Sequence, residues 1–400
     1  MRESFRKFIP YFLLDGYHFI LAFFGALWYG FPSRKVKVIG VTGTNGKTTT
    51  TEMIAKILEE AGYKVALANS IRFKIGDFEE LNLFKMTMPG RFFIQRFLRN
   101  AVSNVCQYAV LEVTSEGIKQ HRHRFINFDI AVFTNLAPEH IEAHGSFEKY
   151  RQAKGELFRA CKNIHIINQD DQNADYFLQF HSNKKFLYGE KDKSQLLYSS
   201  KLLGDFNVYN ALAAVKVGLS QGIDWETCKR AIEKIKTIPG RMEQVISEPF
   251  KVIVDYAFTP AALEKVYQAL TKSYQLNANK LICVLGSAGG GRDKWKRPVL
   301  GELAAKYCSE VIVTNEDPYD ENPMEIIEKV AQGTGGKAEK ILDRRQSIRK
   351  ALELAQLGDV VVITGKGSEP WMCVAKGKKI PWDDREVVKE EYEKIRDFRT

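Results

Sequence analysis

A glycine-rich segment near the N-terminus has the residue types and spacing to hold phosphate groups. It reads Gly43, Thr44, Asn45, Gly46, Lys47, Thr48 and Thr49. An apolar, β-branched run precedes it and a stretch with helical spacing follows it. Glycines let backbone N–H groups converge on phosphate oxygens, and the dipole at a helix N-terminus favours negative charge. Lys47 is placed to reach terminal phosphates and Thr48 to coordinate magnesium, although Val41 stands where the common pattern has glycine.

Two carboxylates stand at the ends of predicted strands. Glu112 ends an apolar run at 108–113, where a carboxylate suits magnesium, although a solvated charge is the alternative. Asp255 follows Val252, Ile253 and Val254, where a short carboxylate can hydrogen-bond sugar hydroxyls or cap a helix. Both positions predict the edge of a sheet as the place where ligands bind.

Short apolar runs alternate with helix-like stretches along the chain. The predicted strands lie at 36–41, 108–113, 130–134, 164–168, 252–256, 281–285, 311–314 and 360–364. This alternation is typical of an α/β fold with parallel sheets and crossover helices. Pro239 and Gly240 follow a charged helical stretch and indicate a linker. The predicted parts are a short hydrophobic helical segment at 1–35, a central phosphate-loop (P-loop) domain with a parallel sheet at 36–238, and a Rossmann-like α/β domain at 239–400.

Composition excludes several classes of protein. The 400 residues are 44% hydrophobic and 27% charged, as in ordinary globular proteins. The net charge of +10 favours anionic ligands such as nucleotide phosphates, nucleic acid or a membrane surface, without choosing between them. None of the six cysteines forms a CxxC pair, which argues against a zinc ribbon or a disulfide-stapled secreted domain. A reducing cytoplasm is the predicted compartment.

An apolar run at 17–31 precedes the phosphate loop. Five cations flank it in the sequence: Arg2, Arg6, Lys7, Arg34 and Lys35. A spanning helix needs about 20 apolar residues, and no signal-peptide cleavage site follows. Three interpretations stay open: a helix packed on the next domain, a peripheral membrane contact through residues 8–31, or a transmembrane span.

A series of motifs in one order resembles the Mur ligase family of ATP-dependent amide ligases in peptidoglycan precursor synthesis. The matching segments are 41–50, 112–115 with 120–122, 134–136 with His140 and His144, Tyr150 with 153–154, 204–211, 238–243, 255–260, 292–298 and 365–369. The resemblance covers roughly residues 36–400 and is strongest to the tripeptide-forming members. It implies that an amino acid is added to a muramyl peptide through an acyl phosphate, with ATP and two magnesium sites.

The resemblance also implies the roles of single residues. At the reacting phosphate and the metal it implies Lys47, Thr48, Glu112, His140 and Lys154. Lys154 matches a lysine that CO₂ converts to a carbamate directed at magnesium. The implied nucleotide contacts are Asn207, Arg241 and Asp255, with Asp255 at the ribose. The implied acceptor contacts are Thr87, Ser115 and Arg122.

The implied amino-acid site departs from one pattern in the family. Its residues are Arg292, Asp317, Tyr319, Gly365 and Glu369. Relatives that add diaminopimelate carry an arginine where this chain has Tyr319, and Asp317, Asp320 and Glu321 lie nearby in the sequence. A site rich in carboxylates should prefer a cationic amino acid, which predicts lysine or ornithine over diaminopimelate.

Family members of this type carry a first domain of about a hundred residues that binds the uridine nucleotide. Here the phosphate loop begins at residue 43, so uridine recognition is expected to be missing, reduced or done differently. Alternative functions are a folylpolyglutamate-synthase-like or poly-amino-acid ligase on another acceptor, and a nucleotide-dependent scaffold with degenerate catalysis. The expected partners are a muramyl peptide and a free amino acid, and no nucleic acid.

Overall fold

The chain forms two compact units that interleave along the sequence. The structure is a computed structural model that describes residues 11–195, 202–274 and 279–399. Unit 1 consists of the chain up to Ala137, Phe147–Ser200 and Val208–Lys234, and unit 2 of Pro138–Ser146, Lys201–Asn207 and Ile235–Thr400. The predicted domain boundaries at 35/36 and 238/239 remain predictions.

Unit 1 is built on an eight-stranded sheet with the strand order β4-β3-β2-β5-β1-β6-β7-β8. Its strands are β1 (Lys37–Thr42), β2 (Val65–Ala68), β3 (Arg72–Ile75), β4 (Phe78–Leu81), β5 (Tyr108–Glu112), β6 (Ile130–Phe133), β7 (Ile164–Asn168) and β8 (Lys184–Tyr188). The strands from β2 to β8 in this order pair in parallel, and β3 and β4 pair antiparallel at one edge. The four predicted strands in this region are confirmed to within a residue or so.

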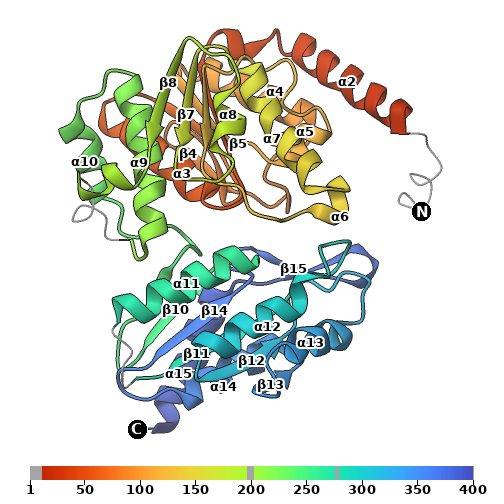
Figure 1. The fold of residues 1–400 in the computed structure, drawn as a ribbon, viewed down its shortest axis with the longest axis vertical. Coiled ribbons are helices and arrows are strands. Elements are labelled where there is room, and N and C mark those ends of the chain that lie inside the picture. The colour runs from red at the N-terminus through yellow and green to blue at the C-terminus, as the bar shows by residue number, and fades with distance from the viewer. Residues whose placement is uncertain (1–10, 196–201, 275–278, 400) are drawn as a thin grey trace. The chain divides into compact units, whose positions relative to one another are not determined.

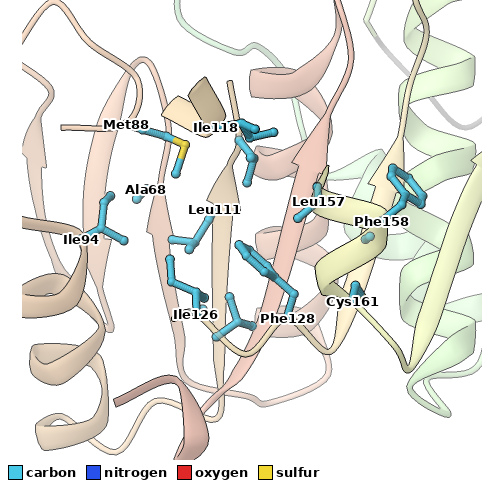
Figure 2. Close-up of a cluster of buried hydrophobic side chains, with 14 of the residues drawn as sticks. Ala68, Met88, Ile94, Leu111, Ile118, Ile126, Phe128, Leu157, Phe158 and Cys161 are labelled. Carbon is cyan, nitrogen blue, oxygen red and sulfur yellow. The ribbon is translucent and has the colours of Figure 1, made fainter. Parts of the chain in front are cut away.

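Helices cover the sheet of unit 1 (Figure 1). The helical segments of this part of the chain are α2 (Tyr11–Trp28), η1 (Pro32–Arg34), α3 (Lys47–Glu60), α4 (Arg91–Ser103), α5 (Ser115–Lys119), α7 (Phe147–Ala160), α8 (Ala174–Leu178), η2 (Glu190–Gln195), α9 (Asp205–Ser220), whose first three residues belong to unit 2, and α10 (Trp225–Glu233). Figure 2 shows one core cluster, in which Leu111 of β5 lies among Ile94 of α4, Ile118 of α5 and Leu157 of α7. Burying these side chains fixes the strand ends from which the site is built.

Unit 2 contains a six-stranded sheet with the order β13-β12-β11-β14-β10-β9, in which only β9 is antiparallel. Its strands are β9 (Glu243–Ile246), β10 (Lys251–Asp255), β11 (Leu281–Leu285), β12 (Glu310–Thr314), β13 (Ala338–Ile341) and β14 (Val360–Thr364), and β15 (Trp371–Val374) and β16 (Lys378–Pro381) form a separate hairpin. The helices are α6 (Ile141–His144), α11 (Pro260–Ser273), α12 (Lys296–Tyr307), α13 (Pro323–Gln332), α14 (Arg344–Leu354) and α15 (Asp384–Arg399), with η3 at Ala375–Gly377.

Alternating strand residues of unit 2 enter two different cores. Ile253 of β10 packs with α11, α12 and α13, whereas Val252 and Val254 pack with α14 and α15. Side chains of a strand point alternately to the two faces of its sheet, so both faces are covered. The predicted α/β fold with parallel sheets is confirmed. Among the described residues, no helix has the length and the apolar character needed to cross a bilayer.

Candidate active site

The glycine-rich loop of unit 1 connects β1 to α3. Gly46 has φ 81°, and a Cβ atom there would collide with the side-chain oxygen of Asn210. Glycine is therefore required by both backbone conformation and space. Lys47 Nζ donates to the carbonyl oxygens of Thr44 at 2.8 Å and Gly43 at 3.1 Å, so its side chain folds back over the loop.

The segment after β6 holds the loop from the other side. Thr134 Oγ1 donates to the carbonyl oxygen of Asn45 at 2.7 Å, and the backbone N–H of Asn45 donates to Asn135 Oδ1 at 3.0 Å. Thr44 Oγ1 lies 3.0 Å from Tyr150 Oη. The residues of the 134–136 motif thus fix the shape of the phosphate loop.

Glu112 collects hydroxyl groups at the end of β5. Its Oε2 accepts hydrogen bonds from Thr48 Oγ1 at 2.9 Å and from Ser70 Oγ and N at 3.1 Å each. Ser70 Oγ also lies 2.8 Å from Thr87 Oγ1. The predicted magnesium residues Thr48 and Glu112 are therefore in direct contact, and Ser70 connects them to the predicted acceptor residue Thr87.

Lys154 of α7 is a buried lysine beside the phosphate loop. Its Nζ donates to the carbonyl oxygen of Gly43 at 2.6 Å, and its side chain is only 2% exposed. Burial holds the pKa of Lys154 well below its ordinary value, the charge of Lys47 lowers it further, and Glu112 opposes the shift. A neutral amine is the form that reacts with CO₂, so this environment fits carbamate formation.

The side chains of unit 1 that could bind magnesium suit a site in which substrate phosphate supplies part of the coordination shell. Within the described ranges, no group of three His, Cys, Asp or Glu side chains is arranged to hold a metal on its own. Magnesium in proteins commonly uses one or two carboxylates and completes its shell with water and substrate phosphates. Thr48 and Glu112 fit that pattern, whereas His140 lies in Pro138–Ser146, a segment of unit 2.

Of the predicted acceptor residues of unit 1, Arg122 contacts the loop that carries Thr87. Arg122 donates to the carbonyl oxygen of Met88, the residue after Thr87, and to Gln120 Oε1 at 2.7 Å. Ser115 is buried in the first turn of α5, after the cap residue Thr114. Arg122 thus fixes the loop that carries Thr87.

The predicted nucleotide residues belong to unit 2. The guanidinium carbon of Arg241 lies 4.4 Å from the centre of the Tyr256 ring. Asp255 accepts the backbone N–H groups of Met242 and Ala257, both at 2.7 Å, and burial raises its pKa against the opposing charge of Arg241. Asn207 donates to the carbonyl oxygen of Leu203 at 2.7 Å.

A buried lysine organises the predicted amino-acid residues of unit 2. Lys366 Nζ donates to both oxygens of Asp317 at 2.9 and 3.0 Å, to Glu369 Oε2 at 2.7 Å and to the carbonyl oxygen of Trp371 at 2.6 Å. Tyr256 Oη donates to Glu369 Oε1 at 2.8 Å. Exposed Arg292 interacts electrostatically with Glu369.

The acids behind the predicted preference for lysine or ornithine are engaged within unit 2. Asp317 pairs with Lys366, Asp320 accepts the backbone N–H of Lys376 at 2.8 Å, and Glu321 pairs with Arg297 at 2.9 Å. Tyr319 lies against Gly290, where a Cβ would collide with its ring. The prediction counted these acids as available to a cationic substrate, and their internal partners remove that basis.

Glu316 lies beside the predicted amino-acid residue Gly365. Gly365 has φ 103°, and a Cβ there would collide with Glu316 Oε2. Burial, reinforced by Asp317, raises the pKa of Glu316 to about 6. Its Oε2 has no hydrogen-bond partner among the described residues.

The segment that carries His140 is fixed to unit 2 by the 292–298 motif. Lys296 Nζ lies 2.8 Å from Glu139 Oε1, and both side chains are buried. Asp293 accepts the backbone N–H of Glu142 at 3.0 Å. This motif therefore positions the residues around His140, a role that its sequence alone did not indicate.

Sequence reasoning missed three residues. Ser70 contacts Glu112 in unit 1, and Glu316 and Lys366 lie among the predicted amino-acid residues of unit 2. Ser70 follows the short strand β2, which was not predicted. Lys366 stands inside the recognised motif 365–369 and Glu316 next to the predicted residue Asp317, each two residues after the end of a strand, β14 and β12 respectively. A systematic search for polar residues just after each predicted strand would have found the last two.

Two family models match the chain: the Mur ligase middle domain at residues 41–200, and the Mur ligase glutamate ligase domain at residues 240–367. The UDP-N-acetylmuramoyl-L-alanyl-D-glutamate–2,6-diaminopimelate ligase of Syntrophomonas wolfei is 39% identical, and the match covers 92% of this chain and 81% of that protein. The UDP-N-acetylmuramyl-tripeptide synthetase of a Roseiflexus species is 35% identical over 91% of this chain and 80% of its own length.

Solved structures agree with these relationships. A UDP-N-acetylmuramoyl-L-alanyl-D-glutamate–2,6-diaminopimelate ligase superposes with a TM-score of 0.59 and 30% identity, covering 90% of this chain and 79% of its own. The folylpolyglutamate synthase of Mycobacterium tuberculosis, at 17% identity, shares the fold with a TM-score of 0.70, over 85% of this chain and 91% of its own. The chain belongs to the Mur ligase family.

Proposed function

We propose that this protein is an ATP-dependent ligase that joins a free amino acid to a muramyl-peptide acceptor. The observation that carries this proposal is the cluster of unit 1, in which Thr48 contacts Glu112 and buried Lys154 contacts the phosphate loop. The similarity to tripeptide synthetases over most of the chain supports the same reaction.

The reaction proceeds in two balanced steps. The acceptor carboxylate attacks the γ-phosphate of ATP, which forms an acyl phosphate and releases ADP. The amine of the amino acid then attacks the acyl carbon, so that an amide bond forms, phosphate leaves and the amine loses a proton. The acceptor carboxylate and the γ-phosphate are both anionic and repel each other, so cationic groups must neutralise their charge.

In the proposed roles, backbone N–H groups of the loop 43–49 bind the phosphates and Lys47 neutralises the terminal phosphates. Magnesium, when bound, lowers the barrier as a Lewis acid that neutralises the developing charge. Thr48 and Glu112 would hold it, with His140 as the proposed residue at a second site. Lys154, as a carbamate, would supply an anionic ligand in place of a cation.

The same proposal includes contacts with the nucleotide and with the acceptor. Asn207, Arg241 and Asp255 are proposed to bind the nucleotide. Thr87, Ser115 and Arg122 are proposed to bind the acceptor.

Arg292 and Glu369 are the proposed contacts of the α-carboxylate and the amine of the amino acid, with Gly365 and Tyr319 at the same site. The nearby acids are engaged and two relatives are named for diaminopimelate, so we propose no preference for lysine or ornithine. The use of ATP leads us to propose the cytoplasm as the compartment.

The test measures phosphate release from ATP with one acceptor and one amino acid at a time. The acceptors are UDP-linked muramyl dipeptide, the same dipeptide without the nucleotide, and a folate, and the amino acids are diaminopimelate, lysine, ornithine and glutamate. Phosphate release that requires both a muramyl peptide and an amino acid supports the proposal. Turnover only with folate and glutamate would assign the folylpolyglutamate type, and no turnover with any pair would indicate a nucleotide-dependent scaffold.

A further inference from the structure

Helix α2 lies at the periphery of unit 1 (Figure 1). Its buried positions include the small residues Ala22, Gly25 and Ala26, and Gly25 packs against Phe92 of α4. A surface helix of a globular protein normally turns its large apolar residues to the core and its polar residues to water. Here the small residues face the protein.

The only Asp, Glu, Lys or Arg residue of α2, the half-exposed Asp15, has a partner on the protein. Asp15 Oδ1 lies 2.8 Å from His121 Nε2. Phe19 and Phe23 contact the ring of Phe125, with centroid distances of 5.2 and 5.4 Å. These contacts fix the rotation of the helix, so that its remaining face is apolar.

The exposed face carries large apolar residues at intervals of four and three residues. They are Leu13, Tyr17, Ile20, Phe24 and Leu27, and Trp28 lies beside them with 80% of its surface exposed. This spacing puts them on one face of the helix, which is about 27 Å long at 1.5 Å per residue. We call these six residues the outer stripe.

Exposed cations lie on the segments next to α2. Arg34 and Lys35 are exposed just after α2, and Arg96 and Arg99 are exposed on α4, which packs against α2. Tyrosine and tryptophan are enriched where proteins meet the headgroup region of a bilayer. Basic side chains next to an apolar helix face are attracted to anionic lipids.

We propose that the outer stripe docks unit 1 on an anionic membrane surface, with α2 lying flat in the interface. This inference does not depend on the ligase assignment. A second copy of the chain fits the stripe less well, because the one acid of α2, Asp15, already lies 2.8 Å from His121 and no other acid of the helix could pair with the partner's cations. Like charges brought together across an interface oppose association.

The experiment measures cosedimentation of the full chain with vesicles. One vesicle preparation is phosphatidylcholine alone, and the other is phosphatidylcholine mixed with phosphatidylglycerol. The wild type is expected to bind the mixed vesicles at least about tenfold more tightly, and salt should weaken this binding. The double variant Ile20→Glu/Phe24→Glu is expected to lose at least tenfold in vesicle affinity, because the stripe no longer enters the interface.

A matched control replaces an exposed leucine of unit 2. Leu357 is 81% exposed, so Leu357→Glu adds a surface acid without touching the stripe, and vesicle binding should stay unchanged. Thermal unfolding of all variants checks that the fold is retained. Equal binding to both vesicles, binding that survives the stripe variant, or no binding would each overturn the proposal. A wild-type dimer that the stripe variant dissociates, without vesicle binding, would assign the stripe to a second copy.

Discussion

Two buried lysines, one in each unit, have opposite surroundings. Lys154 of unit 1 is 2% exposed and donates to the carbonyl oxygen of Gly43. Lys366 of unit 2 is fully buried and donates to the carboxylates of Asp317 and Glu369. Both are long cationic side chains taken out of water, yet among the described contacts Lys154 donates to a backbone carbonyl, whereas Lys366 donates to carboxylates.

The difference separates a reactive lysine from a positioning lysine. A buried amine beside another cation is easily deprotonated, and a neutral amine is a nucleophile. A buried ammonium that is saturated by two carboxylates is held as part of an ion-pair network, which orients its partners. The comparison predicts that changes at Lys154 affect the chemistry, whereas changes at Lys366 affect the architecture of the amino-acid site.

Removing the Lys154 side chain is expected to have the largest effect on activity. Lys154→Ala deletes the amine proposed to become a carbamate, and ligation should fall by about a hundredfold or more. The free energy of unfolding should change little, so that the loss of activity is not explained by a loss of fold. The measurement is the rate of amide formation together with the free energy of unfolding in urea.

Two controls sharpen this prediction. Exposed Lys149 lies on the same helix, α7, and Lys149→Ala should keep wild-type activity. Acetate or formate should restore part of the activity of Lys154→Ala by supplying a carboxylate at the vacated place. Wild-type turnover by Lys154→Ala would exclude the carbamate assignment.

Removing the Lys366 ammonium should destabilise unit 2 strongly. Lys366→Met leaves the carboxylates of Asp317 and Glu369 near each other without their shared cation, which costs about 3–5 kcal/mol in comparable buried pairs. The free energy of unfolding in urea reports the loss. The KM for the amino acid should rise more than the KM for ATP, because both carboxylates lie in the predicted amino-acid site.

A double variant distinguishes pairing from simple loss of packing. Lys366→Met/Asp317→Asn removes one of the unpaired charges and should recover part of the lost stability. Exposed Lys376 provides the matched control, and Lys376→Met should be neutral. If the double variant is as unstable as the sum of the single variants, the two side chains do not act as a pair.

Glu316 is expected to make the free energy of unfolding depend on pH, with a smaller effect than the change at Lys366. Its pKa is raised from 4.5 to about 6, chiefly by burial. Between these values the native state binds more protons than the unfolded state, so this group lowers stability as the pH rises through that window. Glu316→Gln should therefore raise the free energy of unfolding near pH 7 by up to about 2 kcal/mol. Urea unfolding near pH 7 and below pH 4.5 measures it. An equal gain at both pH values would attribute the effect to shape and not to charge.

Sequence reasoning recovered the features that are local in the chain. All eight predicted strands formed, and the two residues expected at magnesium, Thr48 at the start of α3 and Glu112 at the end of β5, are in contact. The short strands β3 and β4 were missed because β4 is exposed and β3 is mostly half-buried, so neither has a continuous apolar run.

What could not be predicted depends on pairing between distant segments. Asp317 and Glu321 were counted as free acids because their partners, Lys366 and Arg297, come from other parts of unit 2. The grouping of His140 with unit 2 rests on the ion pair of Glu139 with Lys296, 157 residues away. Residue types indicate what a side chain can do, whereas three-dimensional packing decides which partner it meets.

Ser70 of unit 1 is the position where we expect the smallest effect of a substitution. Its hydroxyl lies 3.1 Å from Glu112 Oε2 and 2.8 Å from Thr87 Oγ1, so it connects the proposed metal residue to the proposed acceptor residue. In Ser70→Ala the backbone N–H and Thr48 still hold Glu112, and Ser70 is only half-buried, so water can replace the hydroxyl. We expect a loss of about 1 kcal/mol, or roughly fivefold in kcat/KM for the acceptor. Steady-state kinetics with the acceptor varied measures it, and Ser182→Ala, which removes a hydroxyl that donates to the backbone carbonyl of Lys184, is the control. A loss as large as that of Lys154→Ala would mean that Ser70 contacts the reacting groups directly.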